Sequence, residues 1–367
     1  MDPTIRALFS PTPGVAYLDS ATYGLPPEPT TRAMSTALDA WRSGSADWVT
    51  DWDRPAEDAR VSFGRIVGVS AADVALLPAV SVGVGIVAST LGRGDEVVVP
   101  SDEFRSVLFP LLVAKERGAW IREVPFERIA DEIRPGTTLV AVTVVQMQSG
   151  RVIDVEAILE RAQAVGARVL LDATHAIPFV PLSHLIPRAD YVVAAAYKHL
   201  LCPRGVAFMT VRPDRRSGLP ALNAGWRTSD RPWDRFFGGP LTLPDSAARF
   251  DVSLGWLPWV AALESLRLIA DWSASGVLDE PVALAREMAE RLGLAWGGAS
   301  LVCAPVADGE AVRAALREVG VKAAVRGTAI RLSTHVYNDR TDVDRAVDAL
   351  GPFLEPEPAQ PSKVASS

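Results

Sequence analysis

The sequence has few cysteines and few histidines, and this scarcity narrows the chemistry that the chain can perform. Its 367 residues include 2 cysteines and 4 histidines. Two cysteines cannot form the disulfide framework of a small secreted domain, and they suit a reducing cytoplasm. The histidines are scattered and do not combine with cysteine at ligand spacing, so we expect no metal site.

Long apolar runs and blocks of basic residues are also missing. No apolar run approaches the roughly 18–20 residues that a membrane helix needs. The N-terminus, MDPTIRALFSPTPG, has an acid and prolines where a signal peptide has a basic region and an apolar run. The net charge is −7 and no basic block is present. We therefore expect a cytoplasmic protein whose partners include neither a membrane nor a nucleic acid.

What the sequence does contain is a regular alternation of short apolar runs and helical patterns, such as the helical pattern at 155–164. Strands that are apolar on both faces and separated by helices indicate an α/β fold. Its sheet is expected to be mostly parallel and covered by helices on both sides. The runs expected to form strands are 74–77, 96–99, 120–124, 138–145, 169–171, 191–196 and 206–211.

The alternation stops after residue 211, which suggests a second folding unit in a chain longer than one core usually organises. Residues 212–251 are rich in Pro, Gly, Trp and Arg and are expected to form a loop. Helical and strand patterns then alternate up to residue 350. The expected divisions are an N-terminal segment that contributes to the cleft (1–29), a large domain (30–255), a smaller C-terminal α+β domain (256–353) and a disordered tail (354–367).

Polar residues follow two of the apolar runs, where buried strands are expected to end. Asp172 follows the run 169–171, and Tyr197 and Lys198 follow the run 191–196. Ligands of parallel sheets bind at the carboxyl ends of the strands, so a carboxylate and an amine are expected in one crevice. Desolvation lowers the pKa of a lysine and suits it to Schiff-base chemistry.

Each of these residues has a simpler reading when it is taken alone. Lys198 could extend from its strand end to solvent, and Asp172 could cap the next helix. Together they fit pyridoxal phosphate, which needs a lysine for its aldehyde, a carboxylate for its pyridinium nitrogen and a cradle for its phosphate. A helix start near Val80 and Ser81 could supply that cradle.

A competing motif lies beside that helix start. Residues 83–88 fit the pattern G-x-G-x-x-A, which is typical of dinucleotide-binding folds when it follows a strand and opens a helix. The motif is far along the chain for such a fold, and it leaves Lys198 unexplained. A nicotinamide-dependent dehydrogenase is therefore kept as a remote alternative.

Three motifs in this order and spacing carry a family resemblance: LLDATHAIPFVP, ADYVVAAAYKHLLCPRGVAF and IRLSTHVYN. From Tyr17 to Leu350 the chain resembles the class V aminotransferases. This family of fold-type-I pyridoxal-phosphate enzymes includes cysteine desulfurases, kynureninase, isopenicillin N epimerase and the C–S lyase of ergothioneine synthesis. The resemblance implies a fold-type-I α/β architecture, a pyridoxal 5′-phosphate cofactor, an amino-acid substrate and a homodimer with shared active sites.

The resemblance also implies roles for individual residues. Lys198 matches the lysine that forms the Schiff base, Asp172 matches the partner of the pyridinium nitrogen, and His175 lies near the ring hydroxyl. The further positions that match cofactor contacts are Val80 and Ser81 for the phosphate, Phe104 for stacking on the ring, Gln146 beside the ring and Tyr197 for the phosphate.

For the substrate, Arg331 matches the arginine that binds the α-carboxylate, as a planar bidentate fork can. Tyr23 is a second expected substrate contact. Trp226 lies in the loop that could line the entrance, although packing within the loop would equally explain it. Cys303 lies in an apolar run, where it reads as a packing residue, so a persulfide-forming desulfurase is disfavoured.

The expected reaction begins when an amino acid forms an external aldimine with the cofactor and Lys198 removes the Cα proton. The resemblance slightly favours β-elimination of the C–S lyase type on a modified amino acid. Transamination to a keto acid on the same scaffold is the alternative. A non-catalytic protein that binds pyridoxal phosphate is a second remote alternative, because fold and cofactor do not set the reaction.

Overall fold

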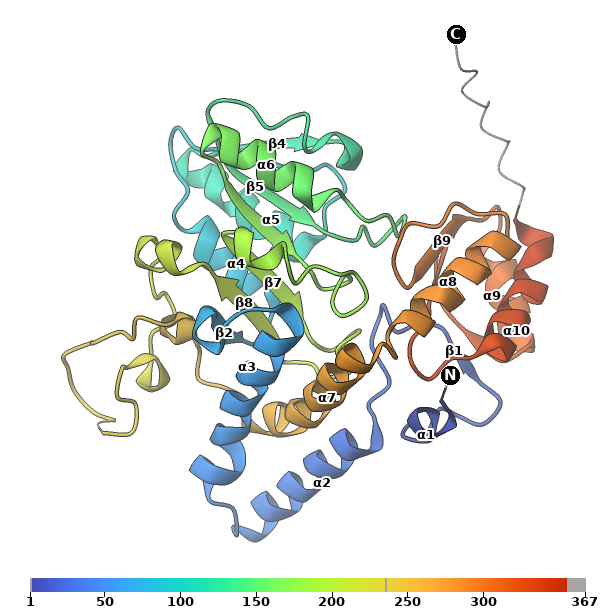
Figure 1. Ribbon diagram of the computed structural model, residues 1–367, viewed down its shortest axis with the longest axis horizontal. Helices are drawn as coiled ribbons and strands as arrows, with labels where there is room; N and C mark the ends of the chain where they lie inside the picture. The colour runs from blue at the N-terminus through green and yellow to red at the C-terminus, as the bar shows by residue number, and fades with distance from the viewer. Residues whose placement is uncertain (1, 235, 355–367) are drawn as a thin grey trace.

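The computed structural model describes residues 2–234 and 236–354. Its centre is one seven-stranded sheet (Figure 1). The sheet has the order β2-β8-β7-β6-β5-β3-β4. The five strands from β7 to β4 in this order run parallel, whereas β8 is antiparallel to both of its neighbours. The strands are β2 (Val74–Leu77), β3 (Glu96–Pro100), β4 (Trp120–Val124), β5 (Thr137–Thr143), β6 (Arg168–Asp172), β7 (Tyr191–Ala195) and β8 (Ala207–Val211).

The continuous apolar runs form strands because both faces of the sheet are covered. Along β5, Val140 and Val142 point to one core, and Leu139 and Ala141 point to the other. Since side chains alternate along a strand, a strand buried on both sides must be apolar at every position. The α/β class with a mostly parallel sheet is therefore confirmed.

Two layers of helices pack on this sheet. One face is covered by α4 (Val80–Ala88) and α5 (Arg105–Ala114), which share a core with the strands. The opposite face is covered by α3 (Arg54–Val67), α6 (Val155–Val165) and α7 (Trp256–Ser275), with α2 (Glu28–Ser43) packed beside α7. The arrangement places the start of α4 at the edge of the sheet where the parallel strands end.

The helix α7 joins the core of the large sheet, although it follows the expected boundary at residue 255. Its residues Trp259, Leu266 and Ile269 are buried with residues of α3 and of the strands. A separate core begins with α8 (Asp279–Arg291). The division of the chain into domains at 29, 255 and 353 stays a prediction, and residues 355–367 of the expected tail lie outside the described residues.

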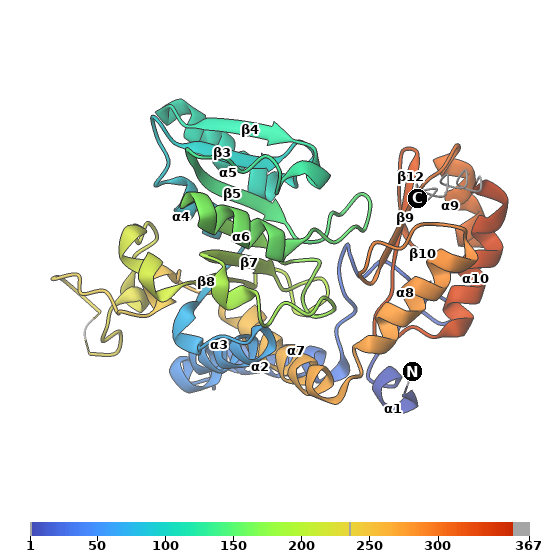
Figure 2. The same cartoon turned by 45° about the horizontal axis from the view of Figure 1, so that its top comes forward.

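The second unit lies beside the large sheet (Figure 2) and contains a three-stranded antiparallel sheet of order β11-β12-β9. Its strands are β9 (Leu301–Pro305), β11 (Ala324–Arg326) and β12 (Ala329–Ser333). Two helices, α9 (Gly309–Glu318) and α10 (Arg340–Leu350), complete its core together with α8. Near the N-terminus, α1 (Pro3–Arg6) precedes β1 (Ala16–Tyr17), which pairs with β10 (Val321–Lys322).

Two local expectations need correction. The G-x-G-x-x-A residues 83–88 lie inside α4 rather than in a turn before it. A Cβ on Gly83 would lie 3.0 Å from side-chain atoms of Leu77 and Val193, so this glycine allows α4 to pack closely on the sheet. The described part of the expected loop, residues 212–234 and 236–251, contains three short 3-10 helices, at Pro213–Gly218, Trp226–Thr228 and Ala247–Phe250.

The helices of the described residues include none that is long and apolar enough to cross a membrane. Within residues 2–234 and 236–354, no group of three His, Cys, Asp or Glu side chains is placed to hold a metal ion.

Candidate active site

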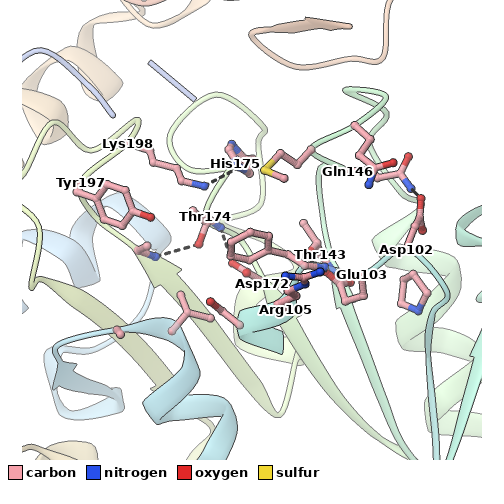
Figure 3. A pocket seen from close by; sticks show the side chains of 18 of the residues that line it. Asp102, Glu103, Arg105, Thr143, Gln146, Asp172, Thr174, His175, Tyr197 and Lys198 are labelled. Carbon is pink, nitrogen blue, oxygen red and sulfur yellow. Dashed lines mark hydrogen bonds between the residues drawn. The ribbon is translucent and has the colours of Figure 1, made fainter. Parts of the chain in front are cut away.

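A cavity of about 390 Å³ opens at the carboxyl edge of the large sheet (Figure 3). The last residues of β3, β5, β6 and β7 all line it, and so does the start of α4. This is the edge at which parallel α/β sheets bind their ligands. The lining residues with polar side chains are Asp102, Glu103, Arg105, Ser106, Thr143, Gln146, Gln148, Asp172, Thr174, His175, Tyr197, Lys198 and Arg204.

Lys198 extends into this cavity from the turn that follows β7. The side chain is buried, and burial lowers the pKa of its amine to about 8, although the charge of Asp172 opposes the effect. Its Nζ lies 2.9 Å from Nε2 of His175 and 5.4 Å from the centre of the Phe104 ring. With this pKa roughly a tenth of the amine is neutral at pH 7, far more than for an exposed lysine, and the neutral amine is the form that attacks a carbonyl group.

Asp172 ends β6 at the floor of the cavity. Its Oδ1 accepts a hydrogen bond from the backbone N–H of Thr174 at 2.9 Å, and burial raises the pKa of its carboxyl. No cation among residues 2–234 and 236–354 forms an ion pair with it. The hydroxyl of Thr174 in turn accepts from the backbone N–H of Ala195, which ties the ends of β6 and β7 together.

His175 lies in the same turn and is almost fully buried. Burial lowers the pKa of its ring well below the ordinary value, and the charge of Lys198 acts in the same direction. The imidazole is therefore neutral, and it can accept or donate a proton at Nε2 toward Lys198. Its other nitrogen, Nδ1, lies 3.3 Å from Nε2 of His199.

Phe104 and Glu103 come from the turn between β3 and α5. The Phe104 side chain is 39% exposed and faces the cavity, so an aromatic ring is available there for stacking. Glu103 is buried and accepts hydrogen bonds from the backbone N–H groups of Phe104 and Thr143 and from the Thr143 hydroxyl. Burial raises the pKa of Glu103 to about 7. This carboxyl therefore holds the Phe104 backbone against the end of β5.

Gln146 follows β5 and also lines the cavity. Its side-chain nitrogen donates to Asp102, and its oxygen accepts from the Ser149 hydroxyl. Both contacts hold the amide in one orientation at the rim (Figure 3).

The end of the cavity nearest α4 has the features of an anion site. Val80 and Ser81 are the first two residues of α4, and no side chain caps this helix start. Free N–H groups at a helix start favour an anion. Val80 and Tyr197 line the cavity, whereas Ser81 does not. The guanidinium of Arg204 lies 5.2 Å from the centre of the Tyr197 ring and adds a positive charge.

The three expected substrate contacts do not line this cavity. Arg331 is buried on β12, where its Nη2 donates to the Thr22 hydroxyl at 2.8 Å. The Tyr23 hydroxyl accepts from Lys322 at 3.0 Å. Trp226 packs against Trp48, with ring centres 5.7 Å apart. Binding of substrate by Arg331, Tyr23 and Trp226 stays a prediction.

Sequence reasoning assigned no role to several residues that the structure brings to the site. Glu103 precedes Phe104, and Thr174 lies between Asp172 and His175, so proximity in the chain was the available signal for both. Arg204 follows Lys198 by six residues and could have been considered as a charge for the phosphate. His199 directly follows Lys198, so the same signal was available, but its contacts with His175 and His335 depend on the packing of distant segments.

The family model for aminotransferase class-V proteins matches residues 16–233. The chain belongs to this family. Over 362 residues it is 26% identical to an uncharacterized aminotransferase, YcbU, of Bacillus subtilis, and the match covers 94% of this chain and 96% of that protein. Isopenicillin N epimerase of Streptomyces clavuligerus is 25% identical over 333 residues, which cover 80% of this chain and 83% of that enzyme.

Solved structures share the fold of this class V protein. An apo cysteine desulfurase of Thermococcus onnurineus NA1 has a TM-score of 0.82 at 19% identity, covering 96% of this chain and 98% of that one. The cystine C–S lyase C-DES, solved with its product cysteine persulfide, has a TM-score of 0.82 at 18% identity, covering 92% and 98%. The fold-type-I architecture is confirmed.

The cofactor of this class V enzyme is pyridoxal 5′-phosphate, and the cavity fits it. A buried carboxyl without an ion pair is available for a pyridinium N–H, and an amine of lowered pKa is available for the aldehyde. An uncapped helix start is available for the phosphate. These three features match the three groups of the cofactor that a protein must bind.

Proposed function

We propose that this class V enzyme cleaves a carbon–sulfur bond by β-elimination from a modified amino acid such as a cysteine S-conjugate. The observation that carries the proposal is an activated amine, Lys198, in a cavity that no cysteine lines. A reaction in which sulfur leaves with the product needs a base at Cα but no protein thiolate. A persulfide-forming desulfurase needs a base and also a cysteine thiolate of the protein to receive the sulfur.

The two thiols of the chain are poorly suited to receive sulfur. Cys202 is buried, and burial raises the pKa of its thiol far above neutrality. Cys303 lies on β9 opposite Arg331, and burial raises its pKa to about 12. The thiolate is the nucleophilic form, and both groups remain thiols near neutral pH.

In the proposed mechanism, the residues of the chain bind the substrate and move its proton. Arg331 binds the α-carboxylate, and Lys198 removes the proton from Cα. Asp172 would hold the pyridinium nitrogen, and Phe104, Gln146 and His175 would orient the ring. When bound, the cofactor supplies an electron sink for the electron pair left at Cα. The bond from Cβ to sulfur breaks, and the proton that Lys198 took from Cα is returned to the departing thiolate. With one water molecule consumed by hydrolysis, the products are a thiol, pyruvate and ammonia.

We also propose that the phosphate binds at the start of α4, between Val80, Ser81 and Tyr197. A homodimer with shared active sites and a cytoplasmic location remain proposals. The family membership supports the first of these. The low cysteine content of the sequence, 2 of 367 residues, is the basis of the second.

Product analysis with cysteine S-conjugates tests the proposed reaction. The loaded enzyme is incubated with S-conjugates and with common amino acids, and its visible spectrum and products are followed. Release of pyruvate, ammonia and thiol in equal amounts is the expected result. A keto acid with aminated cofactor would instead establish a transaminase, and alanine with a protein persulfide would establish a desulfurase. Lys198→Ala is the inactive control.

A further inference from the structure

Three of the four histidines of the chain gather beside Lys198, although they come from distant segments. His175 follows β6, His199 follows Lys198 directly, and His335 follows β12 in the second unit. All three are buried. The fourth, His184, is exposed. A buried group of this kind has defined hydrogen bonds, so the proton positions on its rings can be derived.

The contacts of His335 determine where its own proton lies. The backbone N–H of Val336 donates to Nδ1 at 2.8 Å, so Nδ1 carries no proton. The proton of this neutral ring is therefore on Nε2, which donates to the carbonyl oxygen of His199 at 2.9 Å. Burial lowers the pKa of His335 to about 4, which keeps it neutral. His335 thus anchors the backbone of His199 and takes no part in proton transfer.

The other two rings form a chain of contacts with Lys198. Nζ of Lys198 lies 2.9 Å from Nε2 of His175, and Nδ1 of His175 lies 3.3 Å from Nε2 of His199. Nδ1 of His199 is buried and has no hydrogen-bond partner among the described residues. Phe179 packs edge-on against the His199 ring, with centres 5.3 Å apart, and helps to fix its orientation.

Two arrangements of protons satisfy these contacts. In the first, His199 donates from Nε2 to His175, and His175 donates from Nε2 to the lone pair of a neutral Lys198. In the second, Lys198 donates to His175, His175 donates from Nδ1 to His199, and the proton of His199 lies on Nδ1. The first arrangement leaves Nδ1 of His199 as a buried acceptor without a donor, and the second leaves a buried N–H there without an acceptor among the described residues. Orphaned buried N–H groups are the rarer of the two in folded proteins, so the first arrangement is favoured.

We propose that His199 is a positioning residue: by donating from Nε2 to His175, it keeps the proton of His175 on Nε2 and so favours the neutral amine of Lys198. The neutral amine is the form that combines with the aldehyde of the cofactor. The inference rests on the proposed role of Lys198. The charged groups that also act on Lys198 are Asp172, Arg204, Arg326 and Arg331. The titratable groups that act on His199 are His335, Lys198 and Arg331.

The rate of cofactor capture by the cofactor-free protein tests this role without any turnover. Pyridoxal 5′-phosphate is added across pH 6 to 10, and the rise of visible absorbance is timed. In His199→Phe, a ring of similar shape cannot donate, so the pH profile should move to higher pH. Capture at pH 7 should slow by about three- to tenfold, the effect of losing one hydrogen bond, and capture at pH 10 should be unchanged.

Two further variants separate positioning from packing. His199→Gln retains an amide N–H that can reach Nδ1 of His175, so its profile should return toward that of the unaltered protein. His184→Phe changes the exposed histidine and should have no effect. A His199→Phe profile that superimposes on the unaltered one would overturn the inference. Equal capture by Lys198→Ala would overturn the role of Lys198 itself, and with it the inference.

Nitrogen-15 spectra of the histidine rings provide a test that does not depend on a variant folding. With four histidines, the ring signals of the cofactor-free protein can be resolved and followed at pH 9, above the pKa of Lys198. We expect protons on Nε2 of both His175 and His199. A proton on Nδ1 of either ring at that pH would refute the proposed arrangement.

Discussion

Replacing Lys198 with methionine should stabilise the cofactor-free protein. A buried lysine lowers the free energy of unfolding at every pH at which it must carry a charge. Burial lowers the pKa of Lys198 from 10.5 to about 8. The unfolded chain therefore binds more protons than the folded protein between these pH values, so the stability of the unaltered protein rises with pH across that window. Below pH 8 the folded protein bears the full free-energy cost of burying the charged amine. At about 1.4 kcal/mol per unit of pKa shift, this cost amounts to about 3 kcal/mol.

The expected net gain is smaller than this cost. Methionine removes the hydrogen bond between Nζ and His175, which offsets the gain by about 1 kcal/mol. We therefore expect Lys198→Met to raise the free energy of unfolding by about 2 kcal/mol at pH 7. At pH 9.5 the remaining cost is about 1.4 kcal/mol, so the gain should nearly vanish.

Urea unfolding of the cofactor-free proteins at pH 7 and pH 9.5 measures both values. Lys115→Met is the matched control, since Lys115 is exposed and its replacement should change stability little at either pH. The reasoning would be refuted if Lys198→Met were no more stable than the unaltered protein at pH 7. A gain that stayed constant between the two pH values would refute it equally, because the effect would then come from packing.

Three further predictions concern the loaded enzyme. Phe104→Ala should weaken retention of pyridoxal 5′-phosphate during dialysis by about tenfold, through the loss of about 1–1.5 kcal/mol of stacking, and unchanged retention would argue against stacking. Arg331→Lys should raise KM for an α-amino acid by at least about tenfold, because a lysine cannot form the bidentate contact; an equal loss with the matching amine that lacks the carboxylate would contradict this role. Cys303→Ser should release thiol from cysteine S-conjugates at a rate within about twofold of the unaltered enzyme. Loss of this activity in the variant would indicate that the Cys303 thiol takes part in the reaction.

Much of the fold could be predicted because its information is local. The strands Val74–Leu77 and Trp120–Val124 have the bounds expected from their apolar runs. A run that is buried on both faces is apolar at every position, and the turn residues around it mark its ends. The same logic placed Asp172 and Lys198 at strand ends, and the structure brings both side chains to one cavity.

Other features could not be predicted because they depend on contacts between distant parts of the chain. Trp226 stands in a loop whose composition suggested an entrance, yet its ring packs against Trp48. In the sequence Glu103 resembles an ordinary surface acid. In the structure it is buried and accepts two hydrogen bonds from Thr143 at the end of β5. Neither contact leaves a periodic pattern in the sequence.

The sequence by itself therefore determined the α/β architecture and the cofactor. It also placed Asp172 and Lys198, which we propose meet the pyridinium nitrogen and the aldehyde, at or just after the ends of strands. Tertiary structure decided the environment of those residues. His199 and His335 are 136 positions apart, and only the packing of the second unit against the large sheet brings them into contact. Burial and hydrogen bonding then set the protonation of Lys198, since a pKa depends on the surroundings of a group rather than on its place in the chain.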